Sequence, residues 1–259
     1  MSLKIPSSNT NEPKSIIYST AGQTLISSES IKSTGNNWVS KCPLFPFIPN
    51  NINDGYTSEN SLQLSDSIDR LGWPLAKGPE MINIGAHCKK PRKLPEEFKK
   101  FIEEDSEGLI YAAFGTYPEW SLAPKRIISS LIGAFQRLDK KYKIIFTYNG
   151  PPIKNIGKNI MLTKWAPQLE ILAHPMTKAF ITHGGLKREG LCSGVPLIVM
   201  PLFAEQAHNA QQILVISDPK RIIISKKFRS IFLDRIIPAL DEGTFWLERI
   251  TRLKPGRKL

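Results

Sequence analysis

Polar side chains gather at the ends of apolar runs within residues 165–212. In this stretch a Trp and a Gln precede one apolar run, His183-Gly184-Gly185 follows another, and Glu189 comes shortly after the glycines. Paired glycines let backbone N–H groups approach a ligand closely, and the start of a helix after them favours a bound phosphate. An indole can stack on a base, while amides and carboxylates can bond to a base edge or to sugar hydroxyls. The combination predicts a nucleotide-sugar site.

Each candidate residue has a specific chemical role in this interpretation. Trp165 offers a flat face to a base, Gln168 an amide to its edge, and His183 a hydrogen bond to a phosphate oxygen. Taken singly, each has a structural alternative, because a lone Trp is usually core, a lone His usually a structural hydrogen-bonding group, and Gly-Gly an ordinary turn. Their joint placement favours function. The predicted binding set is Thr116, Trp165, Gln168, His183, Gly184, Gly185, Glu189, Glu205 and Gln206.

A regular alternation of apolar strands and amphipathic helices, beginning after Glu80, must position these residues. The predicted strands cover residues 81–85, 109–115, 142–148, 159–162, 179–182, 196–200 and 221–225. The predicted helices cover 95–104, 124–138, 169–173, 187–193 and 204–215, and residues 232–253 are predicted to be mostly helical. Strands that alternate with helices and lack period-2 alternation indicate an α/β fold with a doubly wound parallel sheet. Ligands bind such a sheet beyond the carboxyl ends of its strands. The candidates follow four of those ends, so we expect them to share one crevice.

The sequence up to Glu80 is irregular by comparison. Residues 1–15 are polar, a short strand is predicted at 16–20, and the Leu and Ile spacing over 58–72 predicts one helix. Turn-forming residues fill most of the remainder, which has too few apolar runs for a complete domain. The chain is therefore divided into a partial domain (1–80), a ligand-binding domain (81–225) and a C-terminal helical segment (226–259).

The 259-residue chain is basic, with a net charge of +12 and a pI of about 9.6. This charge favours acidic partners such as nucleotides, phosphosugars, anionic lipids or nucleic acid. Because the longest basic clusters are short, Lys and Arg scattered over solvated faces are the favoured explanation of the charge. Nucleic acid is disfavoured because aromatic and basic residues are not interleaved. The three cysteines have no CxxC spacing, so no metal site is predicted. The sequence shows neither a signal peptide nor a run of about 18 apolar residues, so we expect the chain as written to be soluble.

The ordered series of motifs resembles the donor-binding signature of the family 1 UDP-glycosyltransferases, in particular the animal UDP-glucuronosyltransferases, and its form is similar to that of nematode members. Specific matches are Trp165-Ala166-Pro167-Gln168, Leu172-Ala173-His174-Pro175, Phe180-Ile181-Thr182-His183-Gly184-Gly185, Glu189, Gly194-Val195-Pro196, Pro201-Leu202-Phe203-Ala204-Glu205-Gln206 and Asn209. Weaker matches lie at 19–22, 82–85 and 114–116.

The resemblance implies a GT-B fold, in which a Rossmann-like C-terminal domain binds the UDP-sugar donor and an N-terminal domain binds the acceptor. The implied reaction is inverting transfer from UDP-glucuronic acid or UDP-glucose to a small lipophilic acceptor, with a His–Asp pair as general base and no metal or cofactor. The family's detoxifying enzymes lie on the lumenal side of the endoplasmic reticulum membrane. The implied roles are uracil stacking for Trp165 beside Gln168, diphosphate contact for His183 with Thr116 nearby, ribose contact for Glu189, and contact with the transferred sugar for Glu205 and Gln206.

Three features depart from the family pattern. The sequence before residue 80 is too short for an acceptor domain, and no catalytic residue is identified because no histidine (His87, His174, His183 or His208) occupies the place of the general base. Glu189 follows His183 by six residues, about two fewer than is usual in the family, which would turn it by roughly 160–200° around a helix. The family's signal peptide, membrane anchor and basic tail are not found.

The sequence therefore predicts a truncated UDP-glycosyltransferase with a nearly complete donor domain and only a remnant of the acceptor domain. The alternative is a catalytically inactive protein that binds a UDP-sugar or docks on full-length family members.

Overall fold

The computed structural model describes residues 2–5, 14–19, 62–65, 81–138, 141–185, 187–203, 206–216 and 226–252. The chain forms two compact units. One contains Met1–Leu25, Pro49–Cys88 and Phe228–Leu259, and the other contains Ile26–Ile48 and Lys89–Lys227. Each unit is described by itself.

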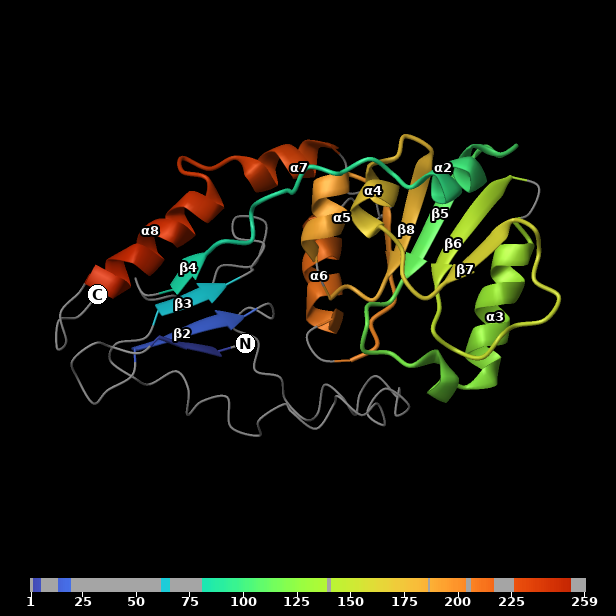
Figure 1. Ribbon diagram of the computed structural model, residues 1–259, viewed down its shortest axis with the longest axis horizontal. Helices are drawn as coiled ribbons and strands as arrows, with labels where there is room; N and C mark the ends of the chain where they lie inside the picture. Colours follow the sequence, from blue (N-terminus) through green and yellow to red (C-terminus); the bar gives the residue numbers. More distant parts are fainter. Residues whose placement is uncertain are drawn as a thin grey trace. The chain divides into compact units, whose positions relative to one another are not determined.

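The larger unit is built on a parallel sheet of five strands, coloured from green to orange in Figure 1. In chain order the strands are β5 (Gly108–Ala113), β6 (Tyr142–Thr147), β7 (Ile160–Thr163), β8 (Thr177–Thr182) and β9 (Leu197–Val199). Their order across the sheet is β7-β6-β5-β8-β9, and every pairing is parallel. The chain thus winds one way from β5 and the other way from β8, which confirms the predicted doubly wound sheet.

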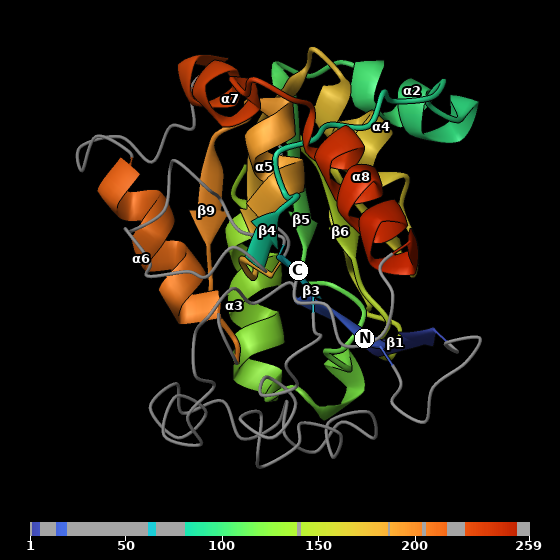
Figure 2. The same ribbon diagram turned by 90° about the vertical axis from the view of Figure 1, so that its left-hand side faces the viewer.

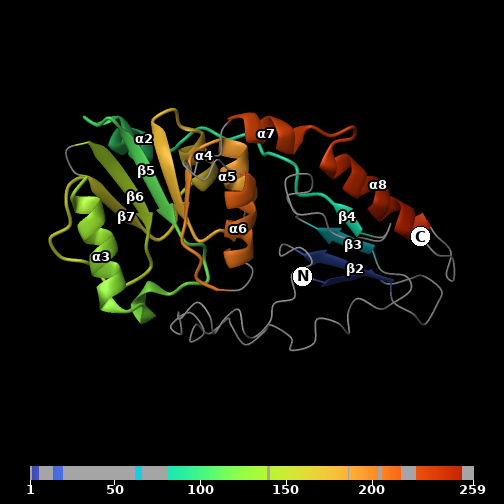
Figure 3. The same cartoon turned by 180° about the vertical axis from the view of Figure 1, so that it is seen from behind.

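Helices cover both faces of this sheet. They are α2 (Glu96–Glu103), α3 (Lys125–Gln136), α4 (Gln168–Ala173), α5 (Lys187–Ser193) and α6 (Gln206–Ile216), with a short 3₁₀ helix, η5, at Trp120–Leu122. Right-handed crossovers in opposite directions place their helices on opposite faces. Accordingly α3, between β5 and β6, lies on one side, and α4 and α5 lie on the other (Figures 1 and 3).

Prolines mark the starts of several helices. Pro95, Pro124 and Pro167 immediately precede α2, α3 and α4. Because the first N–H groups of a helix have no partner within it, a proline at the start removes no helical hydrogen bond. These three helices begin within one residue of the predicted positions.

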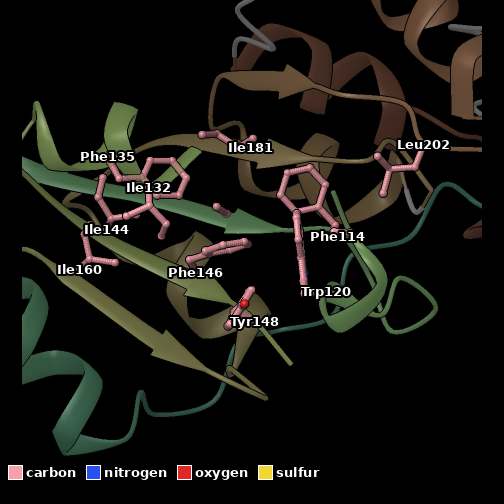
Figure 4. Close-up of a cluster of buried hydrophobic side chains, with 12 residues drawn as sticks. Phe114, Trp120, Ile132, Phe135, Ile144, Phe146, Tyr148, Ile160, Ile181 and Leu202 are labelled. Atoms are coloured by element: carbon pink, nitrogen blue, oxygen red, sulfur yellow. The ribbon is translucent and has the colours of Figure 1, made fainter. Parts of the chain in front are cut away.

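An aromatic core fills the space between α3 and the sheet (Figure 4). Phe114, Trp120 and Phe146 meet edge to face, with ring centroids 5.0–6.2 Å apart. Ala112 of β5 belongs to this cluster. Because side chains alternate along a strand, Tyr111 faces the opposite side, towards α4 and α5.

The smaller unit contains a sheet in the order β1-β2-β3-β4 and one long helix. Its strands are β1 (Ser2–Ile5), β2 (Lys14–Ser19), β3 (Leu62–Ser65) and β4 (Met81–Asn83). Only β1 runs antiparallel to its neighbour. The helix α8 (Ala239–Arg252) packs on β3 and β4, where Leu64, Ile82 and Ile250 form a buried cluster (Figure 2).

One sequence prediction in this unit was wrong. The segment expected to form a helix over 58–72 contains β3 instead, because Leu62 and Leu64 alternate with polar residues and the strand pairs with both β2 and β4. The prediction that residues 232–253 are mostly helical is confirmed for the described residues, which contain the end of α7 (Lys226–Leu233) and, after a break, α8. Pro238 explains the break, because it disfavours helical geometry at the residue before it. The strand expected at 221–225 lies outside the described residues.

Within the described part of the chain, no helix combines the length and the apolar character needed to cross a membrane.

Candidate functional site

The order of the strands reverses between β5 and β8, which are neighbours in the larger sheet. At their carboxyl ends Ala113 pairs with Thr182, so the segments that begin at Phe114 and His183 leave the sheet side by side. In doubly wound sheets this reversal opens a crevice in which ligands bind. The structure therefore places the predicted His183-Gly184-Gly185 turn at the expected position for a ligand.

His183 is enclosed by two glycines that leave room for its ring. A Cβ on Gly115, which has a φ of +80°, would lie 3.0 Å from Nε2 of His183, and a Cβ on Gly185 would clash with the same atom. The imidazole is mostly buried, and its Nδ1 has no hydrogen-bond partner among the described residues. A buried polar nitrogen without a partner is costly, so a ligand oxygen at this point would stabilise the site.

Burial lowers the pKa of His183 to about 4. A hydrogen bond with the Ala113 backbone favours the charged ring and has a smaller, opposite effect on this pKa. Desolvation penalises the charged imidazolium. The ring is therefore neutral at physiological pH, when one ring nitrogen donates a hydrogen bond and the other accepts one.

Asn209 holds the glycine turn from α6. Its Nδ2 donates to the carbonyl of Gly184 at 2.7 Å and to that of Gly185 at 3.5 Å, and its side chain is fully buried. Gly184 has a φ of +81°, and a Cβ on it would lie 2.8 Å from Cγ1 of Val199. The turn is thus fixed between β9 and α6, and only glycine suits its first position.

Gln206, predicted to contact a sugar, is only 2% exposed. Its Oε1 accepts hydrogen bonds from the backbone N–H groups of Leu202 and Phe203, at 2.8 and 3.0 Å. In this structure the side chain therefore holds the loop after β9. Asn209 follows three residues later on the same helical face. That spacing is the signal in the sequence for the role of Asn209, which was predicted only as part of the resemblance.

Gln168 and Glu189 are brought together by the packing of α4 against α5. The amide Nε2 of Gln168 donates to Oε2 of Glu189, and the amide Oε1 accepts from the hydroxyl of Tyr111 at 3.1 Å. The shortened spacing from His183 therefore still leaves Glu189 beside another predicted site residue. Tyr111 was not predicted as a site residue, because nothing in a buried apolar strand indicates the partner of one hydroxyl.

Three predicted residues have no described contact with this arrangement. Trp165 is 74% exposed, which excludes the alternative that it is a core residue; its backbone N–H and C=O are bonded to the hydroxyl of Thr163. Thr116 is exposed directly after Gly115. Glu205 lies outside the described residues.

No group of three or more His, Cys, Asp or Glu side chains that could hold a metal is found in the described segments. His174 lies 3.5 Å from Glu103, which forms a His–carboxylate pair. This pair is at the amino end of β8, the edge of the sheet opposite to the crevice.

Comparisons with known proteins agree with this geometry. The model of the family described as "UDP-glucoronosyl and UDP-glucosyl transferase" matches residues 49–216. The UDP-glycosyltransferase UGT5 of Dactylopius coccus is 30% identical over 223 residues, which cover 76% of this chain and 42% of that protein. Mouse UDP-glucuronosyltransferase 1A6 is 32% identical over 224 residues, which cover 76% of this chain and 41% of that protein. The chain thus spans less than half the length of these curated relatives.

Among solved structures, a UDP-glucosyltransferase from Polygonum tinctorium in complex with 3,4-dichloroaniline superposes with a TM-score of 0.54 at 18% identity. The match covers 74% of this chain and 55% of that structure. At this level of identity the likeness concerns the fold alone, which is the GT-B type of α/β architecture.

Proposed function

This chain belongs to the UDP-glucuronosyl and UDP-glucosyl transferase family, and from that premise we propose that its larger unit binds a UDP-sugar at the carboxyl ends of β5 and β8. The observation that carries the proposal is the position of His183. It lies at the reversal of strand order, between Gly115 and Gly185, with a buried Nδ1 that has no described partner. A diphosphate oxygen can accept a hydrogen bond from this nitrogen in the form of the ring that carries a proton there.

The neutral state of His183 suits this role. In a site of low dielectric a hydrogen bond is stronger than in water, and a neutral ring is cheaper to bury than a charged one. Once the anionic diphosphate is bound, its charge favours the imidazolium and raises the pKa of His183 from about 4. Binding of the ligand and of a proton to His183 are therefore coupled.

The nucleoside is assigned to the second group of residues. The carboxylate of Glu189 can accept hydrogen bonds from the ribose diol while it keeps its bond to Gln168, because an ionised carboxylate has about four lone-pair directions. The exposed indole of Trp165 is available to stack on uracil. Glu205 is assigned to the transferred sugar, and Gln206 acts by holding the loop before it.

The proposed reaction of the whole protein is inverting hexosyl or glucuronosyl transfer to a small lipophilic acceptor. The acceptor oxygen forms a bond to the anomeric carbon, the bond from that carbon to the diphosphate oxygen breaks, and UDP leaves with the electron pair. The proton of the acceptor hydroxyl passes to a general base. No residue of this chain is assigned as that base, and no metal or cofactor is required. On the basis of family membership, we also propose the membrane setting and the detoxifying role of the family for the whole protein.

The second candidate that we propose is binding of a UDP-sugar without transfer, because two of the four histidines are not placed to act as the base. His183 is assigned to the donor site by this proposal, and the His174–Glu103 pair lies at the edge of the sheet opposite to the crevice, too far to accept a proton there. Such a protein would bind UDP and show no turnover, and it could also associate with full-length family members.

Isothermal titration calorimetry with UDP tests the donor site, using the wild type, His183→Asn and the control His174→Asn. We expect the wild type and the control to bind UDP and the His183 variant to lose most of its affinity. Heats at background level in the wild type would sink the proposal. Transfer from UDP-glucuronic acid or UDP-glucose to a phenolic acceptor then separates the two candidates.

A further inference from the structure

Three side chains form a continuous hydrogen-bonded chain from the centre of the larger sheet to its ligand-binding edge. The hydroxyl of Tyr111 on β5 donates to Oε1 of Gln168 at the start of α4, and Nε2 of Gln168 donates to Glu189 on α5. The three elements lie together in Figure 1. Tyr111 is separated from Gln168 by 57 residues and takes no part in the proposed contacts with ligand.

We infer that Tyr111 is a positioning residue for the donor site: through Gln168 it sets the carboxylate of Glu189 for the ribose hydroxyls. This inference rests on the proposed binding of a UDP-sugar. It adds Tyr111, a residue that does not touch the ligand, as a determinant of the specificity for a ribose diol.

The orientation of the Gln168 amide is the first step. An amide can turn by half a revolution and exchange its oxygen and nitrogen. In the reversed orientation its oxygen would face the Glu189 carboxylate, so that two acceptors would oppose each other. The Tyr111 hydroxyl stabilises the observed orientation, because it donates to Oε1 and leaves Nε2 directed at Glu189.

The rigidity of Tyr111 is the second step. Its side chain is 1% exposed and stacks on Phe180 of β8, with ring centroids 5.3 Å apart and an interplanar angle of 11°. Burial raises the pKa of the hydroxyl above its ordinary value; a hydrogen bond with Thr147 opposes this, and the charge of Glu189 adds to it. The hydroxyl therefore keeps its proton, and remains a donor, over the whole working range of pH.

The need for such an anchor comes from the helices. The helix α4 has six residues and α5 has seven. Helices this short are not stable by themselves, and their side chains depend on tertiary contacts for their positions. The hydrogen bonds that start at Tyr111 connect both helices to the most buried strand of the sheet, so they fix the position of Glu189 relative to β5.

The variant Tyr111→Phe tests the inference, because it removes the hydroxyl and retains the stacked ring. Two ligands are titrated by calorimetry: UDP, and 2′,3′-dideoxyuridine 5′-diphosphate, which lacks both ribose hydroxyls. We expect the affinity of the variant for UDP to fall by about three- to tenfold, the effect of one hydrogen bond. Its affinity for the dideoxy ligand should equal that of the wild type.

Tyr148→Phe is the matched control. Tyr148 is also buried in the larger unit, in the aromatic cluster on the other face of the sheet, and its hydroxyl is remote from Gln168. We expect both ligands to bind this variant as they bind the wild type. A cooperative thermal unfolding transition in both variants would show that each is folded.

The outcomes separate the two proposals. If the wild type does not bind UDP, the proposed function fails. If the wild type binds UDP and Tyr111→Phe binds it equally well, or loses both ligands to the same extent, the positioning role of Tyr111 is overturned. Should Tyr111→Phe not fold, Gln168→Met breaks the same chain at an outer residue and must reproduce the selective loss of UDP; equal loss of both ligands contradicts the inference.

Discussion

Gln168 and Glu189, 21 residues apart in the sequence, are joined by a hydrogen bond between the amide Nε2 and the carboxylate Oε2. One residue begins α4 and the other lies in the first turn of α5. The bond is specific in its polarity, since it needs a donor on one side and an acceptor on the other. It also answers the question raised by the short segment after His183, because it shows which way Glu189 is directed.

Replacement of Gln168 by Glu should make the site sensitive to pH. Two facing carboxylates repel each other, so the pKa of the pair rises above that in the unfolded chain. The folded state then binds more protons than the unfolded state, and stability is lost as the pH rises through the raised pKa. We expect denaturant unfolding and UDP titration to show a defect at about pH 8 that lessens at about pH 5, where one protonated carboxyl donates as the amide did.

The control for this prediction is Gln136→Glu. Gln136 makes an exposed hydrogen bond to the backbone oxygen of Asn155, so the substitution brings the same change of charge to a site without the Gln168–Glu189 contact. A matching pH dependence in both variants would contradict the importance of that contact.

Removal of the Asn209 amide should loosen the glycine turn. In Asn209→Ala the carbonyl of Gly184 loses its partner in a buried position, so the free energy of unfolding should fall by about 1–3 kcal/mol. Asn209→Asp should be worse, because carboxylate oxygens would face carbonyl oxygens. Urea denaturation measures both effects. Gln211→Ala, on an exposed position of the same helix, should change the stability little.

Gly185→Ala should disturb His183 directly. The added methyl group would clash with Nε2 of the imidazole, which is enclosed on its other side by Gly115. Overpacking of this kind destabilises by about 1–3 kcal/mol, and UDP binding should be lost with it. Gly133→Ala in α3 is the contrasting variant: the nearest atom to its new Cβ is 3.8 Å away, so we expect a gain of about 0.5–1 kcal/mol. If the two alanines acted alike, the close fit around His183 would be disproved.

His183 should make the protein sensitive to acid. The unfolded chain binds a proton at this residue near its ordinary pKa of 6.5, whereas the folded protein resists protonation down to about 4. The contribution of the neutral ring is therefore fully present above pH 6.5 and is lost as the pH falls from 6.5 towards 4. Denaturant unfolding at several pH values should show that the wild type loses about 3 kcal/mol more than His183→Asn across this interval. Parallel losses in the two proteins would contradict this.

The sequence was sufficient for the larger unit because its signals are local. Apolar runs separated by amphipathic segments predicted the parallel sheet, and prolines marked the starts of three helices. The turn at His183-Gly184-Gly185 lies where the carboxyl end of a predicted strand required it. Chain order alone did not give the order of strands across the sheet, but it placed this turn at the correct end.

Other features depend on contacts between distant parts of the chain. The apolar residues of 62–65 fit either a helix or a strand, and only pairing with β2 and β4 decides between them. The sequence around Gln206 is the same whether its side chain binds a sugar or the backbone of Leu202 and Phe203. The Tyr111 hydroxyl finds its partner 57 residues away. Sequence patterns show which residues are polar but not which hydrogen-bond partner each polar atom has in the fold.

The most direct test of the donor site is an NMR titration of the His183 imidazole against pH, with and without UDP, with its resonances assigned by their loss in His183→Asn. We predict that free His183 titrates with a pKa of about 4, and that UDP shifts the His183 resonances and raises this pKa. The His174 resonances should not move when UDP is added. If UDP binds and His183 titrates as before, or if UDP leaves every histidine resonance in place, then the crevice between β5 and β8 is not a diphosphate site.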